Sequence, residues 1–151
     1  MKLNRRQVLA LGAGAGAVLA TGMPSVAVAA SDPTAQDAIN EFTGGAEVAS
    51  GRIDLGTPEI AENGNTVPIQ VSVESPMTAD DHVAEVLILA DGNPRPGVAT
   101  FKFTEMSGEA MASTRIRLAK TQNVIAVAKM SDGSFYMAKN AVKVTIGGCG
   151  G

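Results

Sequence analysis

The chain has 151 residues, with 12 Lys and Arg against 15 Asp and Glu. Three of the basic residues lie within residues 1–29, which contain no acid, so the remainder carries a formal charge of about −6. This acidic balance disfavours nucleic acid and anionic membranes as partners. The single Cys excludes an internal disulfide, a CxxC redox pair and any cysteine-cluster metal site. With no Trp and only five aromatic residues, the sequence predicts no base-stacking surface and no large cofactor fold.

Residues 1–29 have the pattern of a twin-arginine signal peptide. Arg5 and Arg6 precede a run of Gly, Ala, Leu and Val, and small residues follow near the end of the segment. The apolar run is too short and too rich in glycine to hold a membrane span. We therefore expect cleavage after Ala29 or Ala30 and a mature protein in the periplasm.

Residues 30–51 are predicted to form a short N-terminal helical segment. Asp32 and Pro33 suit the cap and first turn of a helix, and Gly44 with Gly45 suits its end. The apolar residues of this segment recur at helical spacing on one face, namely Ala35, Ala38, Ile39 and Phe42.

Residues 52–146 are predicted to form a β-sandwich domain, because the apolar period changes to two. Turn sequences rich in Gly, Asn, Asp and Pro separate the alternating runs. About seven short strands in roughly a hundred residues favour an all-β, immunoglobulin-like sandwich, although the Cys pair and Trp of antibody domains are absent. The expected strands are 67–73, 83–90, 99–103, 113–118, 124–129 and 142–146, with a weaker one in 52–60.

The last five residues, 147–151, surround the only cysteine, Cys149, with glycines. A buried structural role is the usual one for a lone cysteine, but four glycines offer nothing to pack and have the greatest conformational freedom. Lacking side chains, they could pass through a narrow channel into the active site of another protein. The pattern predicts a covalent attachment point at Cys149 on a flexible arm of Gly147, Gly148, Gly150 and Gly151.

Other polar groups give weaker signals. His82 follows two acids, but with no second His it is better interpreted as a polar residue at the start of a strand than as a metal ligand. A Cys149–His82 nucleophile and base pair would lack a group to orient the base. The sequence thus predicts no catalytic residue, metal site or cofactor. Arg115, Arg117 and Lys120 form a basic row, for which a solvated face is favoured and a partner or anion contact is the minor alternative.

Two alternatives to a carrier arm use the same tail. An exported structural or adhesive sandwich could form an intermolecular disulfide through Cys149. A ubiquitin-like sulfur carrier would load sulfur on the terminal carboxylate after Gly150-Gly151. Activation of such a carrier requires ATP, and its fold pattern differs from the strand pattern of this sequence.

The tail, 142–151, after a twin-arginine signal, resembles the C-terminus of the SoxY family of the Sox thiosulfate-oxidation system. The resemblance extends over the whole mature chain. It includes 58–68, the Asn-Pro-Arg-Pro turn at 93–96 and the Ser-Thr-Arg-Ile-Arg-Leu-Ala segment at 113–119.

This resemblance implies a non-catalytic carrier that works in the periplasm as a heterodimer with SoxZ, a second small β-sandwich protein. The haem-containing SoxAX would join thiosulfate to Cys149 as a cysteine S-thiosulfonate. The manganese hydrolase SoxB would release sulfate, and the sulfane dehydrogenase SoxCD, where present, would oxidise the remaining persulfide. The resemblance implies no cofactor in the carrier itself.

Overall fold

The computed structural model describes residues 33–149 of the chain. The predicted signal peptide with Arg5 and Arg6 therefore lies outside the described residues, as do Asp32, Gly150 and Gly151. Among residues 33–149, no helix is long and apolar enough to cross a membrane.

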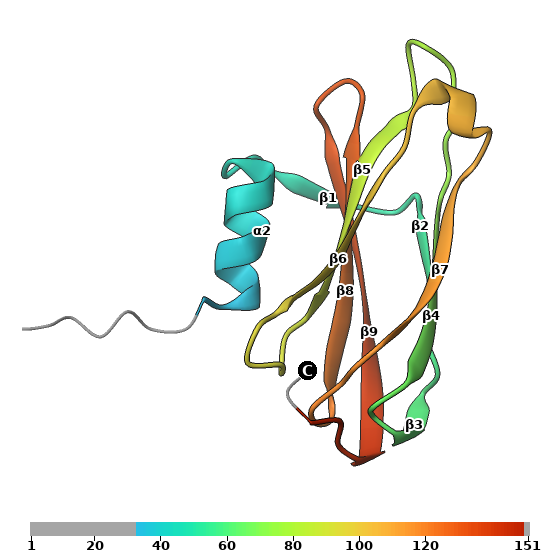
Figure 1. Ribbon diagram of the computed structural model, residues 1–151. Coiled ribbons are helices and arrows are strands. Elements are labelled where there is room, and N and C mark those ends of the chain that lie inside the picture. The colour runs from blue at the N-terminus through green and yellow to red at the C-terminus, as the bar shows by residue number, and fades with distance from the viewer. Residues whose placement is uncertain (1–32, 150–151) are drawn as a thin grey trace, which may run out of the picture. The chain divides into compact units, whose positions relative to one another are not determined.

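The described chain is a two-sheet β-sandwich with one short helix, which confirms the predicted fold class (Figure 1). The larger sheet has the order β1-β9-β8-β5-β6, and β3 pairs with β9 outside that path. Its strands are β1 (Val48–Ser50), β3 (Ile60–Asn63), β5 (Val83–Ala90), β6 (Gly97–Lys102), β8 (Gln122–Met130) and β9 (Phe135–Ile146). The smaller sheet has the order β2-β4-β7, with strands β2 (Ile53–Gly56), β4 (Val67–Val73) and β7 (Ala110–Ile116).

The helix α2 (Ala35–Thr43) begins slightly later than Asp32 and Pro33 suggested. Its N-cap is Thr34, which forms a capping box with Asp37: the Asp37 N–H donates to Thr34 Oγ1, and the Thr34 N–H donates to the Asp37 carboxylate. The helix ends at Gly44, whose φ of 66° lies in the left-handed region that glycine tolerates best.

The described residues form nine strands rather than about seven. β1 falls within the segment expected to be helical and pairs in parallel with the start of β9, and β3 pairs in parallel with the end of β9. The weak strand expected in 52–60 corresponds to β2, and β3 begins only at Ile60, the last residue of that range, and pairs in the other sheet. A 3₁₀ turn, η1 (Glu105–Ser107), connects β6 to β7.

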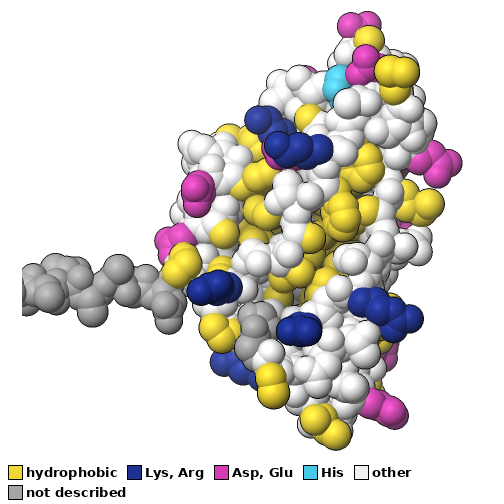
Figure 2. Space-filling model, in the orientation of Figure 1, with side chains coloured by type: hydrophobic (Ala, Val, Ile, Leu, Met, Phe, Trp, Pro, Cys, Tyr) yellow, Lys and Arg dark blue, Asp and Glu magenta, His cyan; other side chains and the backbone are white. Residues whose placement is uncertain are grey.

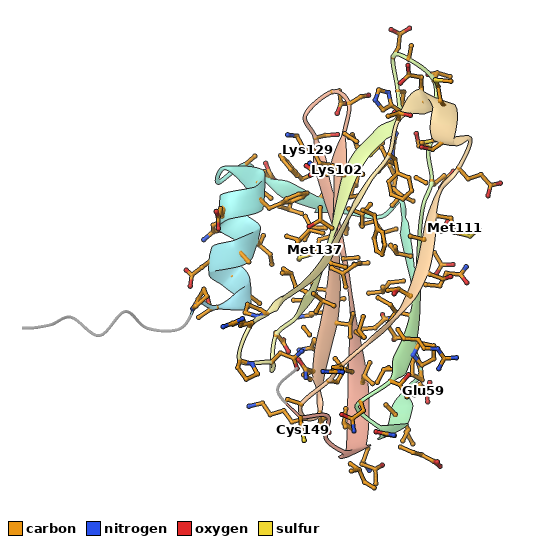
Figure 3. All side chains as sticks on the ribbon, viewed as in Figure 1. Glu59, Lys102, Met111, Lys129, Met137 and Cys149 are labelled. Carbon is orange, nitrogen blue, oxygen red and sulfur yellow. The ribbon has the colours of Figure 1, made fainter. Side chains whose placement is uncertain are left out.

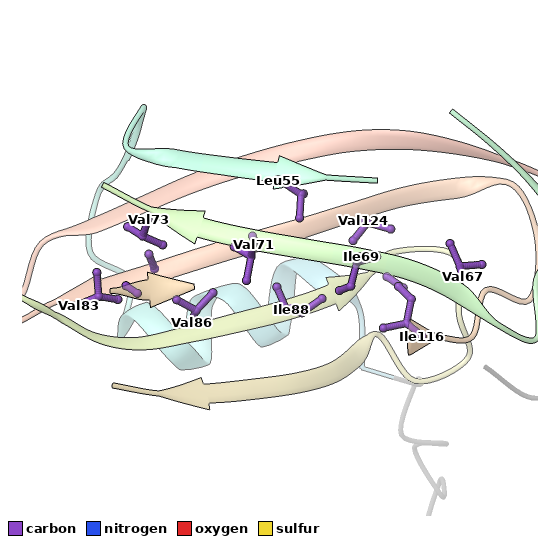
Figure 4. Packing of buried hydrophobic residues seen from close by; sticks show 14 of the residues in the cluster. Leu55, Val67, Ile69, Val71, Val73, Val83, Val86, Ile88, Ile116 and Val124 are labelled. Atoms are coloured by element: carbon purple, nitrogen blue, oxygen red, sulfur yellow. The ribbon is translucent and has the colours of Figure 1, made fainter. Parts of the chain in front are cut away.

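The main core lies between the two sheets. Alternate residues of β4 are fully or nearly fully buried there, and they face the inward side chains of β5 and β8 (Figure 4). The residues shown in close packing include Leu55, Val67, Ile69, Val71, Val83, Val86, Ile88, Ile116 and Val124.

A second apolar cluster covers the opposite face of β5 and β8. There α2 packs Ala35 and Ile39 against Leu89, Ile125 and Val127. These two strands are buried on both faces, which explains why their sequences are continuously apolar rather than alternating.

Candidate functional site

The tail beyond β9 is held against two turns of the sandwich by backbone hydrogen bonds. The N–H of Gly64 donates to the carbonyl of Ile146 (2.7 Å), and the N–H of Leu118 donates to the carbonyl of Gly64 (2.8 Å). The N–H of Gly148 in turn donates to the carbonyl of Leu118 (2.9 Å). We call this arrangement, which joins Gly64, Leu118 and Gly148, the tail clasp.

The glycines of the clasp are required by close packing. Gly148 is buried, and a Cβ there would lie 2.7 Å from the carbonyl oxygen of Gly64. A Cβ on Gly147 would overlap the carbonyl oxygen of Ala119, and one on Gly64 would overlap the carbonyl oxygen of Leu118. The expectation that the tail glycines pack against nothing is therefore wrong for Gly147 and Gly148. The flexibility expected of the arm stays a prediction.

Cys149 directly follows the clasp residue Gly148 and lies at the lower end of the molecule in Figure 3. Its N–H donates to Oδ1 of Asn65 (3.3 Å), and Asn65 is itself held by a hydrogen bond from its N–H to Oδ1 of Asn63 (3.0 Å). The side chain of Cys149 is exposed and its thiol is free. The structure thus fixes the backbone at Cys149 while leaving the sulfur accessible.

A buried polar network supports the segment on which the tail docks. Nδ2 of Asn93 donates to the carbonyl of Arg117 (2.9 Å), and Oδ1 of Asn93 accepts from the N–H of Ala119 (2.9 Å). The side chain of Gln122 donates to both Oδ1 of Asn93 (2.8 Å) and the carbonyl of Lys120 (3.0 Å). Asn93 and Gln122 are both buried, and together they fix residues 117–120.

Sequence reasoning did not assign a role to Asn93 or Gln122. For Asn93 the available signal was its place in a segment used for the family resemblance, 93–96, whereas Gln122 lies outside those segments. The structure shows that this segment meets the other two, 58–68 and 113–119, at this end of the sandwich. Gly64 and Asn65 come from 58–68, Asn93 from 93–96, and Leu118 and Ala119 from 113–119.

Positively charged side chains gather at the end of the sandwich where the tail docks. Arg95, Arg115 and Arg117 line one surface pocket of about 320 Å³, beside Asn93 and Val98. Figure 2 shows Lys and Arg side chains over the lower part of this face, and Cys149 lies at the same end of the molecule in Figure 3. Of the predicted basic row, Arg115 and Arg117 line this pocket together with Arg95, which comes from a different turn, whereas Lys120 lines another pocket.

His82 lies far from Cys149. It precedes β5, whose first residue pairs with the last residue of β8, whereas Cys149 follows the opposite end of β9. The twelve residues of β9 separate the two ends by roughly 35 Å. Nδ1 of His82 lies 2.9 Å from the carbonyl of Thr78, which is a local turn contact. The structure therefore does not bring His82 to the thiol, and the described residues contain no group of three or more potential metal ligands.

Comparison with known proteins gives one family and one group of fold relatives. The family model described as "Sulfur oxidation protein SoxY" matches residues 39–149. The structure of the sulfur carrier protein SoxY from Chlorobium limicola f thiosulfatophilum is 35% identical, with a TM-score of 0.60, and the match covers 74% of this chain and 96% of that one. No curated protein matches the chain.

Superoxide reductases share the fold at much lower identity. The superoxide reductase (neelaredoxin) from Ignicoccus hospitalis is 19% identical with a TM-score of 0.56, covering 74% of this chain and 93% of that one. A putative superoxide reductase from Thermotoga maritima is 18% identical with a TM-score of 0.52, covering 68% and 89%. These two likenesses show the sandwich fold alone. The family match over most of the chain, the identity to a SoxY structure, and a free cysteine on a glycine tail agree, and the chain belongs to the SoxY family of sulfur oxidation proteins.

Proposed function

We propose that this chain is a periplasmic carrier that holds thiosulfate-derived sulfur covalently on Cys149 and presents it to partner enzymes. The observation that supports this role most directly is the position of the thiol. Cys149 is the only cysteine, its side chain is exposed, and it stands beyond the last strand between a docked glycine and two further glycines.

The proposed chemistry needs partners, because each step requires a reactant that the chain does not supply. Joining the outer sulfur of thiosulfate to the thiol forms an S–S bond and releases one proton and two electrons. The haem protein SoxAX is the proposed electron acceptor. Hydrolysis of the resulting S-thiosulfonate by SoxB breaks the bond to the terminal sulfonate sulfur, consumes one water and releases sulfate and a proton. A persulfide then remains on Cys149, which SoxCD would oxidise where it is present.

The geometry suits a carrier better than an enzyme. His82, the one histidine of the chain, is at the other end of β9 from the thiol and cannot act as its base. Covalent attachment prevents the intermediate from diffusing away between enzymes, so the chain needs no deep pocket of its own. We infer that activation of the thiol occurs inside each partner.

Family membership implies the Sox system and a SoxZ partner in general. We propose that the mature chain forms a heterodimer with SoxZ and reaches the periplasm by the twin-arginine pathway, as the Arg5-Arg6 pair suggests.

Replacing the thiol tests the carrier role. Cys149→Ser removes the nucleophilic sulfur but keeps a side chain of similar size at an exposed position. In a reconstituted system with SoxZ, SoxAX and SoxB, we expect sulfate formation from thiosulfate to stop, with an unchanged melting temperature. Sulfate formation by this variant would contradict the proposal.

The adduct can also be detected directly. Intact mass measurement of the protein from thiosulfate-grown cells, with and without reductant, should show a reductant-labile sulfur adduct on the peptide containing Cys149. A bare thiol or a symmetric disulfide under turnover conditions would instead support the structural alternative.

A further inference from the structure

The arginine cluster, defined as Arg95, Arg115 and Arg117, is a concentration of positive charge on an acidic protein. Apart from residues 1–29, the chain carries nine basic and fifteen acidic side chains, yet three of the nine line this one pocket. Among the described residues, the two salt bridges are Arg52–Asp81 and Lys102–Glu85, so no carboxylate of that part of the chain lies within 4 Å of the cluster. Its charge is therefore available to an external anion.

The cluster is built on a rigid base. Arg95 projects from the turn that begins at Asp91, and Arg117 from the connection after β7, and these two segments are joined through buried Asn93. A second link comes from Gln122, whose Oε1 accepts from the N–H of Gly92 (2.8 Å). The network holds the backbone from which Arg95 and Arg117 project, and an anion site gains when the segments that carry its donors are held in place.

The cluster adjoins the residues that hold Cys149. Nη1 of Arg115 lies 3.4 Å from Oγ1 of Thr66, and Thr66 directly follows Asn65, the residue that accepts the Cys149 N–H. Leu118, which accepts the Gly148 N–H, directly follows Arg117. Gly148 and Cys149 therefore lie beside the segments that carry the two arginines.

An S-thiosulfonate would put one negative charge on the side chain of Cys149, at the end of the molecule that carries the cluster. Its two S–S bonds of about 2 Å each carry the sulfonate up to about 4 Å beyond Sγ. Guanidinium groups are well matched to such an oxyanion, because their N–H groups donate in a fixed fork. A neutral thiol has no comparable interaction.

We propose that Arg95, Arg115 and Arg117 form an anion site for the terminal sulfonate of the Cys149 adduct while the tail is docked. This inference rests on the proposed carrier function and names the ligand that this site binds. The site favours the docked arm in the loaded protein more than in the unloaded one, and it shields the adduct from thiols in solution.

The test compares two adducts of similar size and different charge, made on the mature chain in complex with SoxZ. Tetrathionate converts the Cys149 thiolate to the S-thiosulfonate and releases thiosulfate. Methyl methanethiosulfonate converts it to the uncharged S-methyl disulfide and releases methanesulfinate. We expect the arginine Nε resonances of the cluster to shift with the first adduct and stay unchanged with the second. Equal shifts with both adducts would overturn the proposal.

Substitution provides the second readout. In Arg115→Gln/Arg117→Gln, we expect a neutral thiol to remove the thiosulfonate about two- to five-fold faster than in the parent, as suits an exposed ion pair. Removal of the methyl adduct should be unchanged. Lys129→Gln, at the opposite end of the molecule (Figure 3), is the matched control and should change neither rate. If the double variant does not fold, Arg95→Gln alone tests the same prediction.

The variant Cys149→Ser, which cannot form the adduct, tests whether the arginine cluster binds free thiosulfate as well as a tethered sulfonate. We expect thiosulfate at a concentration equal to the protein to leave the arginine resonances unshifted, because tethering supplies an effective concentration in the millimolar range. Full shifts under these conditions would overturn the tethered site. Both adducts are made chemically, so the resonance shifts and the removal rates test the anion site without the partner enzymes. Failure of the carrier function would show separately, as sulfate formation by Cys149→Ser.

Discussion

Gly148 is buried in a segment whose composition suggests freedom of movement. Its hydrogen atom faces the carbonyl of Gly64, where a Cβ would come within 2.7 Å. Glycine permits two opposite behaviours, since a missing side chain allows both disorder and very close backbone approach. The sequence alone could not distinguish them, because the carbonyl groups that contact Gly147 and Gly148 come from residues 64 and 119.

The Gly148→Ala variant is expected to release the tail while leaving the sandwich folded. The added methyl group clashes with backbone, but Gly148 lies after β9, so its displacement breaks no strand pairing. Hydrogen exchange at the amide of residue 148 should become at least about ten-fold faster, with a melting temperature within a few degrees of the parent. The control is Gly97→Ala, where a Cβ meets nothing within 4 Å. Unchanged exchange at residue 148 would contradict the clasp.

Asn93 is expected to be more costly to replace than a surface residue. Asn93→Ala leaves the N–H groups of Ala119 and of the Gln122 side chain without their shared acceptor, which costs about 1–3 kcal/mol of unfolding free energy. Urea denaturation measures this loss. Exchange at residue 148 should accelerate in the same variant, because the 117–120 connection carries the carbonyl that holds the tail. If Asn93→Ala loses stability while hydrogen exchange at residue 148 is unchanged, the polar network does not support the tail clasp.

The sequence alone singles out Cys149 as the candidate site, since a lone cysteine among glycines is an unusual composition. Asn93 was not, because its role depends on three segments far apart in the sequence. One of the segments quoted for the resemblance contains it, but only the structure shows that its side chain bonds the backbone at 117 and 119.

At the scale of elements, the strands that alternate cleanly were predicted best. β4 spans Val67–Val73 and β5 spans Val83–Ala90, as expected, because a buried face every second residue or a continuous apolar run is visible in the sequence. β1 was missed because its three residues are too few to show a period and it is stabilised by pairing with distant β9. The early part of β9 was missed for a related reason, since its residues are largely half-buried rather than alternating.

The cap of α2 gives a prediction that depends on pH. Hydrogen bonds from the side chain and backbone of Thr34 lower the pKa of Asp37 from its ordinary value of 3.8. A lowered pKa in the folded state means that the carboxylate stabilises the helix above pH 3.8, and that this contribution is lost as the pH falls through the lowered pKa. The difference in stability between the parent and Asp37→Asn should therefore be present at neutral pH and close at low pH. If the difference in stability persists at a pH where the Asp37 carboxyl is protonated, it does not come from the charge of that carboxylate.

Removing the cap hydroxyl should also weaken the helix. Thr34→Ala is expected to cost about 1 kcal/mol, because the N–H of Asp37 loses its side-chain acceptor. Limited proteolysis within residues 35–43 should be faster than in the parent. Thr100→Ala, at an exposed position of β6, is the control and should leave cleavage within residues 35–43 unchanged.

The whole molecule has two apolar clusters on opposite faces of one sheet. Ile88 belongs to the cluster between the sheets, and its neighbour Leu89 belongs to the cluster under α2. Both side chains are fully buried, so each replacement by Ala is expected to cost about 2–5 kcal/mol of unfolding free energy.

Leu89→Ala and Ile88→Ala should differ in which element becomes accessible to protease. Leu89→Ala should expose α2 to protease under conditions in which Ile88→Ala does not, because only Leu89 packs in the helix cluster. Chemical denaturation gives the free energies, and peptide mapping gives the first cleavage site. Equal protection of α2 in both variants would show that the helix and the sandwich unfold as one unit.

The tail clasp makes the body of the protein a competitor for its own arm. A partner enzyme that needs Cys149 extended must first draw it from its contacts with Gly64, Leu118 and Asn65. If roughly nine in ten copies hold the arm docked, each partner binds about ten-fold more weakly than it would bind a free arm. For a given state of Cys149, that penalty is the same for every partner that requires the extended arm, and it therefore weakens all of them without favouring any. Because a docked arm cannot enter a partner, this loss of affinity is a slower capture of the arm. An arm that one enzyme releases returns to the clasp, and this leaves the carrier free to reach the next enzyme.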